Sequence, residues 1–168
     1  LRDADRLVAE AAARGARLVA LPEYFPLISG DETDKVRARE KEGEGPLQDF
    51  LRETALRHKV WLIGGSIPLE ASVPEKVRNS CLVFDDAGRR VARYDKIHLF
   101  GYQSGTEHYE ESRTIEAGGE AVAFDSPVGR VGLSICYDLR FPALYLSMGP
   151  VDLLGVPAAF THPTGHAH

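Results

Sequence analysis

The first part of the chain alternates a helix pattern with a strand pattern. Apolar residues recur at helical spacing from Ala4 to Ala12, and Gly15 is a suitable stop for that helix. Residues 18–21 are continuously apolar, which predicts a strand that is buried on both faces. Pro22 ends this strand because proline cannot donate to a sheet ladder. Glu23 is therefore predicted to lie just beyond the end of a buried strand.

The next stretch predicts a loop, a second helix and a second strand. Residues 29–45 are rich in charge and glycine, so we expect a mobile surface loop. Pro46 can begin a helix, whose apolar positions would face inward. Residues 60–63 form the next apolar strand, which Gly64 and Gly65 close.

The second half predicts paired strands separated by a polar loop. Residues 79–84 and 89–97 have the pattern of a β-hairpin around a turn. Residues 101–119 carry few structure signals and are predicted to form a long polar loop. Residues 121–124 and 130–135 can pair across the turn between them.

A short helix over residues 141–148 and an apolar strand over residues 151–156 complete the pattern. Because helices and strands alternate at both ends with hairpins between them, we expect a mixed α/β layer architecture rather than an all-parallel sheet. The sequence shows no internal repeat, no low-complexity tract and no linker. It therefore predicts a single domain over residues 1–168.

Composition narrows the classes of function. A net charge of −5 gives no basic surface for nucleic acid. No segment approaches the roughly 18 consecutive apolar residues that a membrane-spanning helix needs, and no signal peptide opens the sequence. Two cysteines, Cys81 and Cys136, do not make a disulfide scaffold and suit a reducing cytoplasm. We expect a cytoplasmic protein without nucleic-acid or membrane partners.

Cys136 is the main candidate for chemistry because of its position. It follows a short apolar run and precedes a stretch that can form a helix. At such a junction the backbone turns sharply, the sulfur can project into a cleft, and nearby N–H groups can hold an oxyanion. The commoner fate of a lone cysteine is burial as a small hydrophobe. Glu23 and Lys96, each taken singly, are more often surface charges.

The three residue types together make a thiol mechanism possible. A free thiol has a pKa of about 8.5, so only a few per cent is thiolate at neutral pH. The carboxylate of Glu23 could take the proton of Cys136 during attack. The ammonium of Lys96 could stabilise the thiolate and then an oxyanion. The backbone N–H of Tyr137, which follows the nucleophile, is a natural second oxyanion donor.

Three segments closely resemble the signature blocks of the nitrilase superfamily, the carbon–nitrogen hydrolases: LVALPEYF at 18–25, RYDKIHLF at 93–100 and GLSICYDLRFP at 132–142. The segments follow the family's order with fitting separations, and VPAAFTHPTG at 156–165 is similar to the segment after the cysteine block. The resemblance covers essentially the whole chain. It implies Glu23 as general base, Lys96 as oxyanion stabiliser and Cys136 as nucleophile.

The resemblance also implies a second glutamate and a fold. The family carries a glutamate between the lysine and cysteine blocks, and YEESRT at 109–114 resembles that segment, with Glu111 as the best match and Glu110 as its neighbour. The implied fold is a four-layer α-β-β-α sandwich. The family's first strand and everything after TGHAH are missing from this sequence, which suggests an incomplete domain.

The resemblance further implies amide hydrolysis. The segments KIHLF, CYDLRFP and TGHAH are similar to the amidase branch related to omega-amidases and deaminated-glutathione amidases. True nitrilases typically carry Cys-Trp-Glu at the nucleophile, where Tyr137 and Asp138 follow Cys136 here. We expect hydrolysis of a small carboxamide through a Cys thioester, with release of ammonia or an amine. No metal or organic cofactor is implied, and a homodimer or higher homo-oligomer is.

Other functions and other residues stay open at this point. A nitrilase or carbamoylase could use the same Glu-Lys-Cys triad, and a non-catalytic interaction module could keep the fold. Period-two alternation would put His98 on the strand face of Lys96, so a Cys-His dyad is conceivable, although a hydrogen-bonded structural histidine is favoured.

The remaining candidates are given structural interpretations. Pro163 and Gly165 interrupt the cluster of His162, His166 and His168, which lacks a cysteine or carboxylate, so a zinc site is not expected. Cys81 is predicted to be core. Arg140 could bind a substrate carboxylate or hold the turn through an ion pair, and the second role is favoured.

Overall fold

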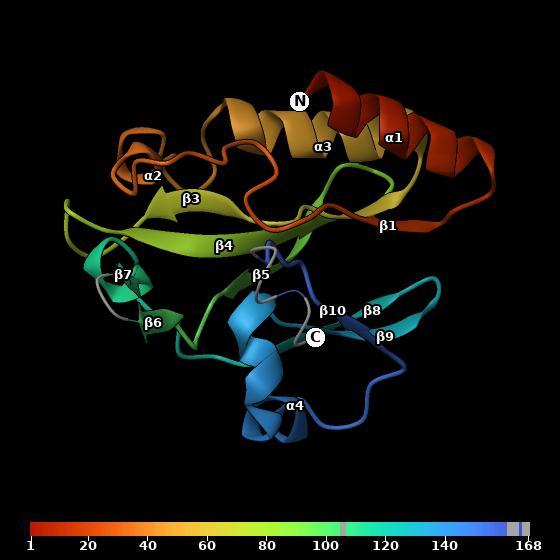
Figure 1. The fold of residues 1–168 in the computed structure, drawn as a ribbon. Helices are drawn as coiled ribbons and strands as arrows, with labels where there is room; N and C mark the ends of the chain where they lie inside the picture. Colours follow the sequence, from red (N-terminus) through yellow and green to blue (C-terminus); the bar gives the residue numbers. More distant parts are fainter. Residues whose placement is uncertain (105–106, 161–164, 166–168) are drawn as a thin grey trace.

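Two β-sheets lie face to face between helices, in an α-β-β-α order of layers (Figure 1). This computed structural model describes residues 1–104, 107–160 and 165, with only the backbone of residues 104, 107 and 108. The elements in chain order are α1 (Arg2–Ala13), β1 (Leu18–Ala20), α2 (Asp34–Arg37), α3 (Pro46–His58), β2 (Trp61–Ile63), β3 (Ile67–Glu70), β4 (Val77–Phe84), β5 (Arg90–Asp95), β6 (Gly101–Ser104), β7 (Glu107–Glu110), η1 (Glu111–Arg113), β8 (Val122–Ser126), β9 (Gly129–Leu133), η2 (Cys136–Arg140), α4 (Pro142–Ser147) and β10 (Leu153–Gly155).

The first sheet has the order β1-β2-β4-β3, with β5 also paired to β4. The strands β1 and β2 are parallel, and the remaining pairs are antiparallel. The predicted hairpin of β4 and β5 is confirmed, and its turn closes where the N–H of Asp85 donates to the carbonyl of Arg89. Gly88 adopts a φ of 72° in this turn, a conformation that favours glycine.

The second sheet has the order β10-β9-β8. The predicted antiparallel pairing of β8 with β9 is confirmed, and β10 adds in parallel to β9. The predicted short helix and the last strand correspond to α4 and β10. Residues Cys136–Arg140 (η2) connect the end of β9 to α4, so the candidate nucleophile lies at the carboxyl end of a buried strand.

Period-two alternation along β4 supplies two separate cores. Leu82 and Phe84 pack with Val8 and Leu51 of the helices α1 and α3. Cys81 and its neighbour Val83 point the other way, into the core between the two sheets. Cys81 is fully buried there, which confirms its prediction as a core residue. Because one strand serves both layers, the two sheets and the outer helices are fixed relative to one another.

Two predictions about the first half of the chain were wrong. Strand β1 is only half-buried because it lies at the edge of its sheet, where Ala20 is exposed. The expected loop at 29–45 contains the short helix α2 and the buried carboxylate of Glu40. Glu40 accepts hydrogen bonds from the backbone N–H groups of Leu47 and Gln48, so it caps the start of α3.

The predicted polar loop at 101–119 was also wrong, because it contains the β6–β7 hairpin and the 3-10 helix η1. The predicted strand at 89–97 is shorter than expected. It ends at Asp95, so Lys96 and His98 lie beyond the strand and do not share a face by alternation.

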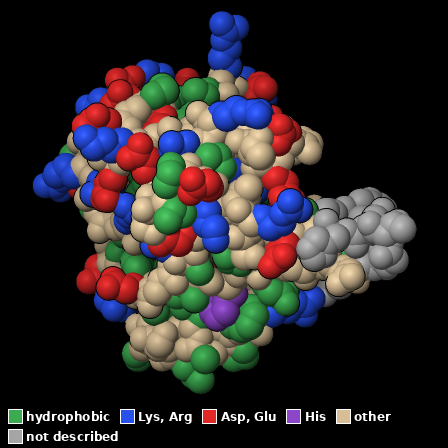
Figure 2. Space-filling model, turned by 90° about the vertical axis from the view of Figure 1, so that its left-hand side faces the viewer, with side chains coloured by type: hydrophobic (Ala, Val, Ile, Leu, Met, Phe, Trp, Pro, Cys, Tyr) green, Lys and Arg blue, Asp and Glu red, His purple; other side chains and the backbone are tan. Residues whose placement is uncertain are grey.

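The surface agrees with the charge balance of the sequence. Acidic and basic side chains are interspersed over the face shown in Figure 2, without a basic patch. Among the described residues, no helix is long and apolar enough to cross a membrane.

A tight contact at Gly118 holds the chain directly before Lys96. The N–H of Gly118 donates to the carbonyl of Lys96, and a Cβ added at Gly118 would lie 2.2 Å from the carbonyl oxygen of Asp95. Replacement Gly118→Ala is expected to lower the free energy of unfolding by about 1–3 kcal/mol, because backbone must move to admit the methyl group. Urea denaturation of the intact protein measures this loss.

Gly119 is the matched control, because an added Cβ there meets nothing within 4 Å. The Gly119→Ala variant is expected to unfold at or slightly above the wild-type urea midpoint. Equal destabilisation by the two substitutions would contradict the role given to the Gly118 contact.

Candidate active site

The turn after β1 places the carboxylate of Glu23 in the interior. Glu23 is 3% exposed, and the next residue, Tyr24, adopts a φ of 49°. The N–H of Tyr24 donates to the hydroxyl of Ser66 over 3.1 Å. Gly65 makes this close approach possible, since a Cβ there would lie 2.1 Å from the carbonyl oxygen of Pro22. The turn is therefore held against the segment that joins β2 to β3.

Two carboxylates meet the ammonium of Lys96. Lys96 Nζ lies 3.1 Å from Glu23 Oε1 and 2.9 Å from Glu111 Oε2, and all three side chains are at least 95% buried. Burial alone would lower the pKa of Lys96, but the charges of Glu23 and Glu111 outweigh it and raise that pKa. The lysine therefore stays charged between its two partners.

Further hydrogen bonds fix the orientation of Glu23. Its Oε1 accepts from the side-chain amide of Asn79 over 2.9 Å, and its Oε2 accepts from the N–H of Ala159 over 3.0 Å. Asn79 lies on β4 and Ala159 follows β10, so the carboxylate is tied to a strand of the first sheet and to the segment after the second sheet. The side-chain oxygen of Asn79, Oδ1, is buried without a partner among the described residues.

Glu111 is positioned by the segment that sequence patterns assigned to a loop. It begins η1, directly after β7, and is 4% exposed. Its Oε2 accepts from the N–H of Phe100 over 2.8 Å, in addition to the bond with Lys96. The structure thus brings Glu111, rather than the partly exposed Glu110, to the lysine.

Cys136 lies beside Glu23 in a strained conformation. It adopts a φ of 50°, in the left-handed region, while its N–H donates to the carbonyl of Pro157 over 2.9 Å. Burial and the neighbouring carboxylate of Glu23, which accepts a hydrogen bond from the thiol, raise the pKa of Cys136 to about 12, against an opposing effect of Lys96. The resting sulfur is therefore a protonated thiol with a base in contact.

The other candidates from the sequence lie elsewhere or outside the described residues. His98 bonds to Asp138 through its Nδ1 over 2.8 Å and stacks on Phe141, so it takes a structural position. Arg140 is exposed at the end of η2. His162, His166 and His168 lie outside the described residues, and within the described part no group of three potential metal ligands is found.

Sequence reasoning missed three residues around the centre: Asn79, Asp138 and Lys35. A polar Asn79 within the apolar strand β4, and a carboxylate two residues after Cys136, were the available signals. Lys35 on α2 lies 5.6 Å from the centre of the Tyr24 ring. Burial lowers the pKa of Lys35, and the charges of Glu111 and Glu32 oppose this effect.

The hydroxyl of Tyr24 lies close to the same centre. It is buried and has no hydrogen-bond partner among the described residues. Burial, with the charges of Glu111 and Glu23, raises the pKa of this tyrosine, so it stays a potential donor. An unpartnered buried donor beside two carboxylates and a thiol is suited to contact a bound molecule.

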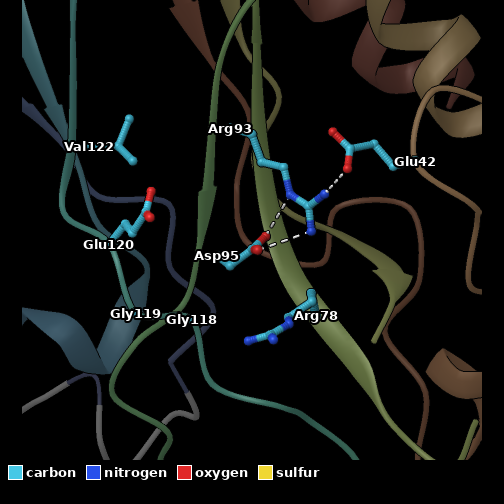
Figure 3. Close-up of a pocket in the computed structure, with 8 residues that line it drawn as sticks. All are labelled: Glu42, Arg78, Arg93, Asp95, Gly118, Gly119, Glu120 and Val122. Carbon is cyan, nitrogen blue, oxygen red and sulfur yellow. Dashed lines mark hydrogen bonds and ion pairs between the residues drawn. The ribbon is translucent and has the colours of Figure 1, made fainter. Parts of the chain in front are cut away.

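A separate open pocket of about 530 Å³ lies beside β5 (Figure 3). Among its lining residues, Arg93 bonds to Asp95 and to Glu42, while Arg78 bonds to Glu116 outside the lining. The described lining residues of this pocket include no nucleophile.

Comparisons with known proteins find one matching family and several similar relatives. The family described as Carbon-nitrogen hydrolase matches residues 1–153. Deaminated glutathione amidase of Yersinia enterocolitica is 41% identical over 92% of this chain and 55% of its own length. Omega-amidase NIT2 of Homo sapiens is 41% identical over 96% of this chain and 58% of its own length. The chain therefore spans slightly more than half of these relatives.

A solved structure supports the fold directly. The NitFhit protein of C. elegans superposes with a TM-score of 0.83 and 35% identity, over 99% of this chain and 42% of that one. The expected α-β-β-α fold is confirmed by this match.

The thiol should become more acidic when the neighbouring carboxylate is neutralised. Since the charge of Glu23 raises the pKa of Cys136 and Lys96 lowers it, Glu23→Gln is expected to bring that pKa below about 12, so that thiolate forms at a lower pH. Thiolate absorbance at 240 nm, followed from pH 7 to pH 11 in the intact protein, measures the shift.

The Cys136→Ser variant gives the background from Cys81, whose burial raises its pKa to about 12. An unchanged titration curve in Glu23→Gln would show that the carboxylate does not act on the thiol.

Proposed function

Because the chain belongs to the carbon–nitrogen hydrolase family, we propose that it hydrolyses the C–N bond of a small carboxamide through a thioester on Cys136. The observation that carries the proposal is the buried cluster in which Lys96 bridges Glu23 and Glu111 while Glu23 contacts a protonated thiol. This cluster holds a nucleophile, a base and a cation within one site. The amidase names of the relatives favour amides over nitriles.

In the first step the sulfur of Cys136 attacks the amide carbonyl while Glu23 takes the thiol proton. The C–S bond forms, and the carbonyl oxygen becomes an oxyanion near Lys96 and the N–H of Tyr137. The negative charge has then moved from Glu23 to the substrate oxygen. Because Lys96 contacts Glu23 directly, its ammonium can stabilise the negative charge on either the carboxylate or the oxyanion. The net charge of the buried site stays the same.

The second half of the reaction returns the enzyme to its starting state. As the C–N bond breaks, protonated Glu23 gives its proton to the leaving ammonia or amine. Glu23 then takes a proton from water, whose oxygen attacks the thioester, and the sulfur leaves and recovers its proton from Glu23. Glu111 keeps Lys96 charged and in place throughout. These steps need no metal and no organic cofactor.

The position of Lys35 favours a substrate that carries a negatively charged group in addition to the amide. Its ammonium has no ion-pair partner among the side chains that the structure describes, and it lies beside Tyr24, next to the catalytic cluster. A substrate carboxylate placed there would give this partly buried ammonium a direct ion pair.

A cytoplasmic location and a homo-oligomer remain part of the proposal. Both cysteines are free and buried, which suits a reducing compartment. On α4 and the preceding turn, Leu146 is 81% exposed and Leu139 is 42% exposed, and such apolar side chains are commonly covered in an assembly.

Removal of the nucleophile is expected to abolish hydrolysis. The Cys136→Ala variant should lose about 10³-fold or more in kcat on a carboxamide, because the other thiol, Cys81, is fully buried in the core. Cys81→Ala, which removes the other buried thiol, is the matched control and should keep near wild-type kcat.

A panel of paired amides, nitriles and carbamoyl compounds separates the alternatives. Faster hydrolysis of nitriles or carbamoyl compounds would assign the triad to another branch. Unchanged hydrolysis in Cys136→Ala would refute the thiol mechanism, and a wild-type protein inactive on the whole panel would favour an interaction module.

Charge selection by Lys35 can be measured with two substrates. The Lys35→Met variant is expected to raise KM about 10-fold for an amide that carries a carboxylate, and less than about 2-fold for a neutral amide of equal size. Lys41→Met, which removes a surface lysine paired with Glu44, is the control. Equal effects of Lys35→Met on both substrates would remove the charge-recognition role.

A further inference from the structure

The carboxylate of Asp138 joins the nucleophile turn to the segment after Lys96. Asp138 is fully buried within η2, two residues after Cys136. Its Oδ2 accepts from the backbone N–H of Ile135 over 2.9 Å and from the hydroxyl of Tyr94 over 2.6 Å. Its Oδ1 accepts from the backbone N–H of His98 over 2.9 Å and from the ring Nδ1 of the same residue over 2.8 Å. Each oxygen thus has two donors.

These four bonds act on both sides of the reaction centre. The bond from Ile135 and the return bond from the N–H of Asp138 to the carbonyl of Ile135 close a small ring around Cys136. That ring holds a non-glycine residue at a φ of 50°, a conformation that costs about 1–3 kcal/mol and persists only when its surroundings fix it. The sulfur's direction therefore depends on the Asp138 carboxylate.

The other partners of Asp138 belong to residues 94–100, the segment that contains Lys96. Tyr94 and His98 lie two residues before and two residues after Lys96. The same segment also orients Glu111, because the N–H of Phe100 donates to that carboxylate. Ring contacts add to this, since His98 stacks on Phe141 and Phe100 meets the ring of Tyr137 edge-on. One buried carboxylate therefore sets where the thiol lies relative to the ammonium.

We propose that Asp138 is a positioning residue for the reaction. It acts through His98 and Ile135 to hold the sulfur of Cys136 at a fixed position relative to Lys96 and Glu23. The inference rests on the proposed thiol hydrolysis. A small displacement of a reacting atom by a residue that does not touch substrate can cost about 10²-fold in rate. The effect should fall on kcat, because none of these four hydrogen bonds is made to a substrate.

The test uses the intact protein and counts active sites. In Asp138→Asn, one oxygen that accepts hydrogen bonds becomes an NH₂ group that faces existing donors. We therefore expect kcat per active site to fall about 10²-fold, with KM changed less than about 3-fold. Active sites are counted by mass spectrometry as the fraction of Cys136 that an activated amide acylates in the first turnover, because an unfolded chain does not form this thioester. A residue with only a structural role would lower the number of acylated sites and leave kcat per site at the wild-type value, which would overturn the proposal.

His98 supplies a conservative rescue. His98→Ala removes the side-chain donor to Asp138 and should lower kcat per site about 10-fold, whereas His98→Asn keeps an N–H near the position of Nδ1 and should recover most of the rate. In the Asp138→Asn background the two His98 variants should no longer differ, because their effect passes through that carboxylate. Additive losses in the double variants would contradict this coupling.

The initial rate of Cys136 alkylation keeps the inference testable if the proposed function fails. Were the wild type inactive on every amide, slower iodoacetamide labelling in Asp138→Asn than in the wild type would still support positioning of the thiol beside Glu23. Equal labelling rates would refute it, whatever the substrate proves to be.

Discussion

The structure depends on one buried ammonium held between two buried carboxylates. Lys96 meets Glu23 and Glu111, which come from the end of β1 and the start of η1. Removing water from three charges costs several kcal/mol per ion, and the cost is offset only where geometry and additional hydrogen bonds satisfy each group. Asn79, Ala159 and Phe100 supply those additional bonds. Loss of Lys96 would leave two carboxylates in the interior without their counter-charge.

This constraint explains features that look unrelated along the chain. The turn after β1 has to bring a carboxylate inward, and Gly65 admits that turn by its lack of a side chain. Strand β5 ends one residue before Lys96, and Gly118 packs on that end so closely that a methyl group does not fit. The β6–β7 hairpin leads directly into Glu111. Each local irregularity serves to deliver one charge to the same point.

Much of the fold could be predicted from the sequence, because its strands are apolar and its helices follow the expected spacing. The β4–β5 hairpin, the β8–β9 pair and the helix from Pro46 all have local signals. The β6–β7 hairpin could not be predicted from residues 101–110, since these residues are mostly polar and the two strands form a small sheet of their own. Strand β1 was wrongly expected to be buried on both faces, because an apolar run does not reveal that a strand lies at a sheet edge.

Some residues of the candidate site could likewise be predicted from the sequence, and others could not. Glu23, Lys96 and Cys136 could be proposed because each stands at the end of a recognisable strand pattern, and their chemistry is complementary. Asp138 and Asn79 could not, because a polar residue near a nucleophile gives no sign in the sequence of which donors it will meet. Lys35 lies in a charged segment where nothing distinguishes it from neighbouring surface lysines. The bonds of Asp138 with Tyr94 and His98, and of Asn79 with Glu23, each join segments that are 40 or more residues apart in the sequence.

The most direct test of the account is the mass of the protein during turnover of an activated amide whose leaving group departs quickly, so that thioester hydrolysis limits the rate. Rapid quenching followed by peptide mapping should find the mass of the acyl group on the peptide that contains Cys136, at a level close to one per active site. Product release in a burst without acyl mass on Cys136, or with that mass on another residue, would contradict the central claim that this buried thiol is the nucleophile.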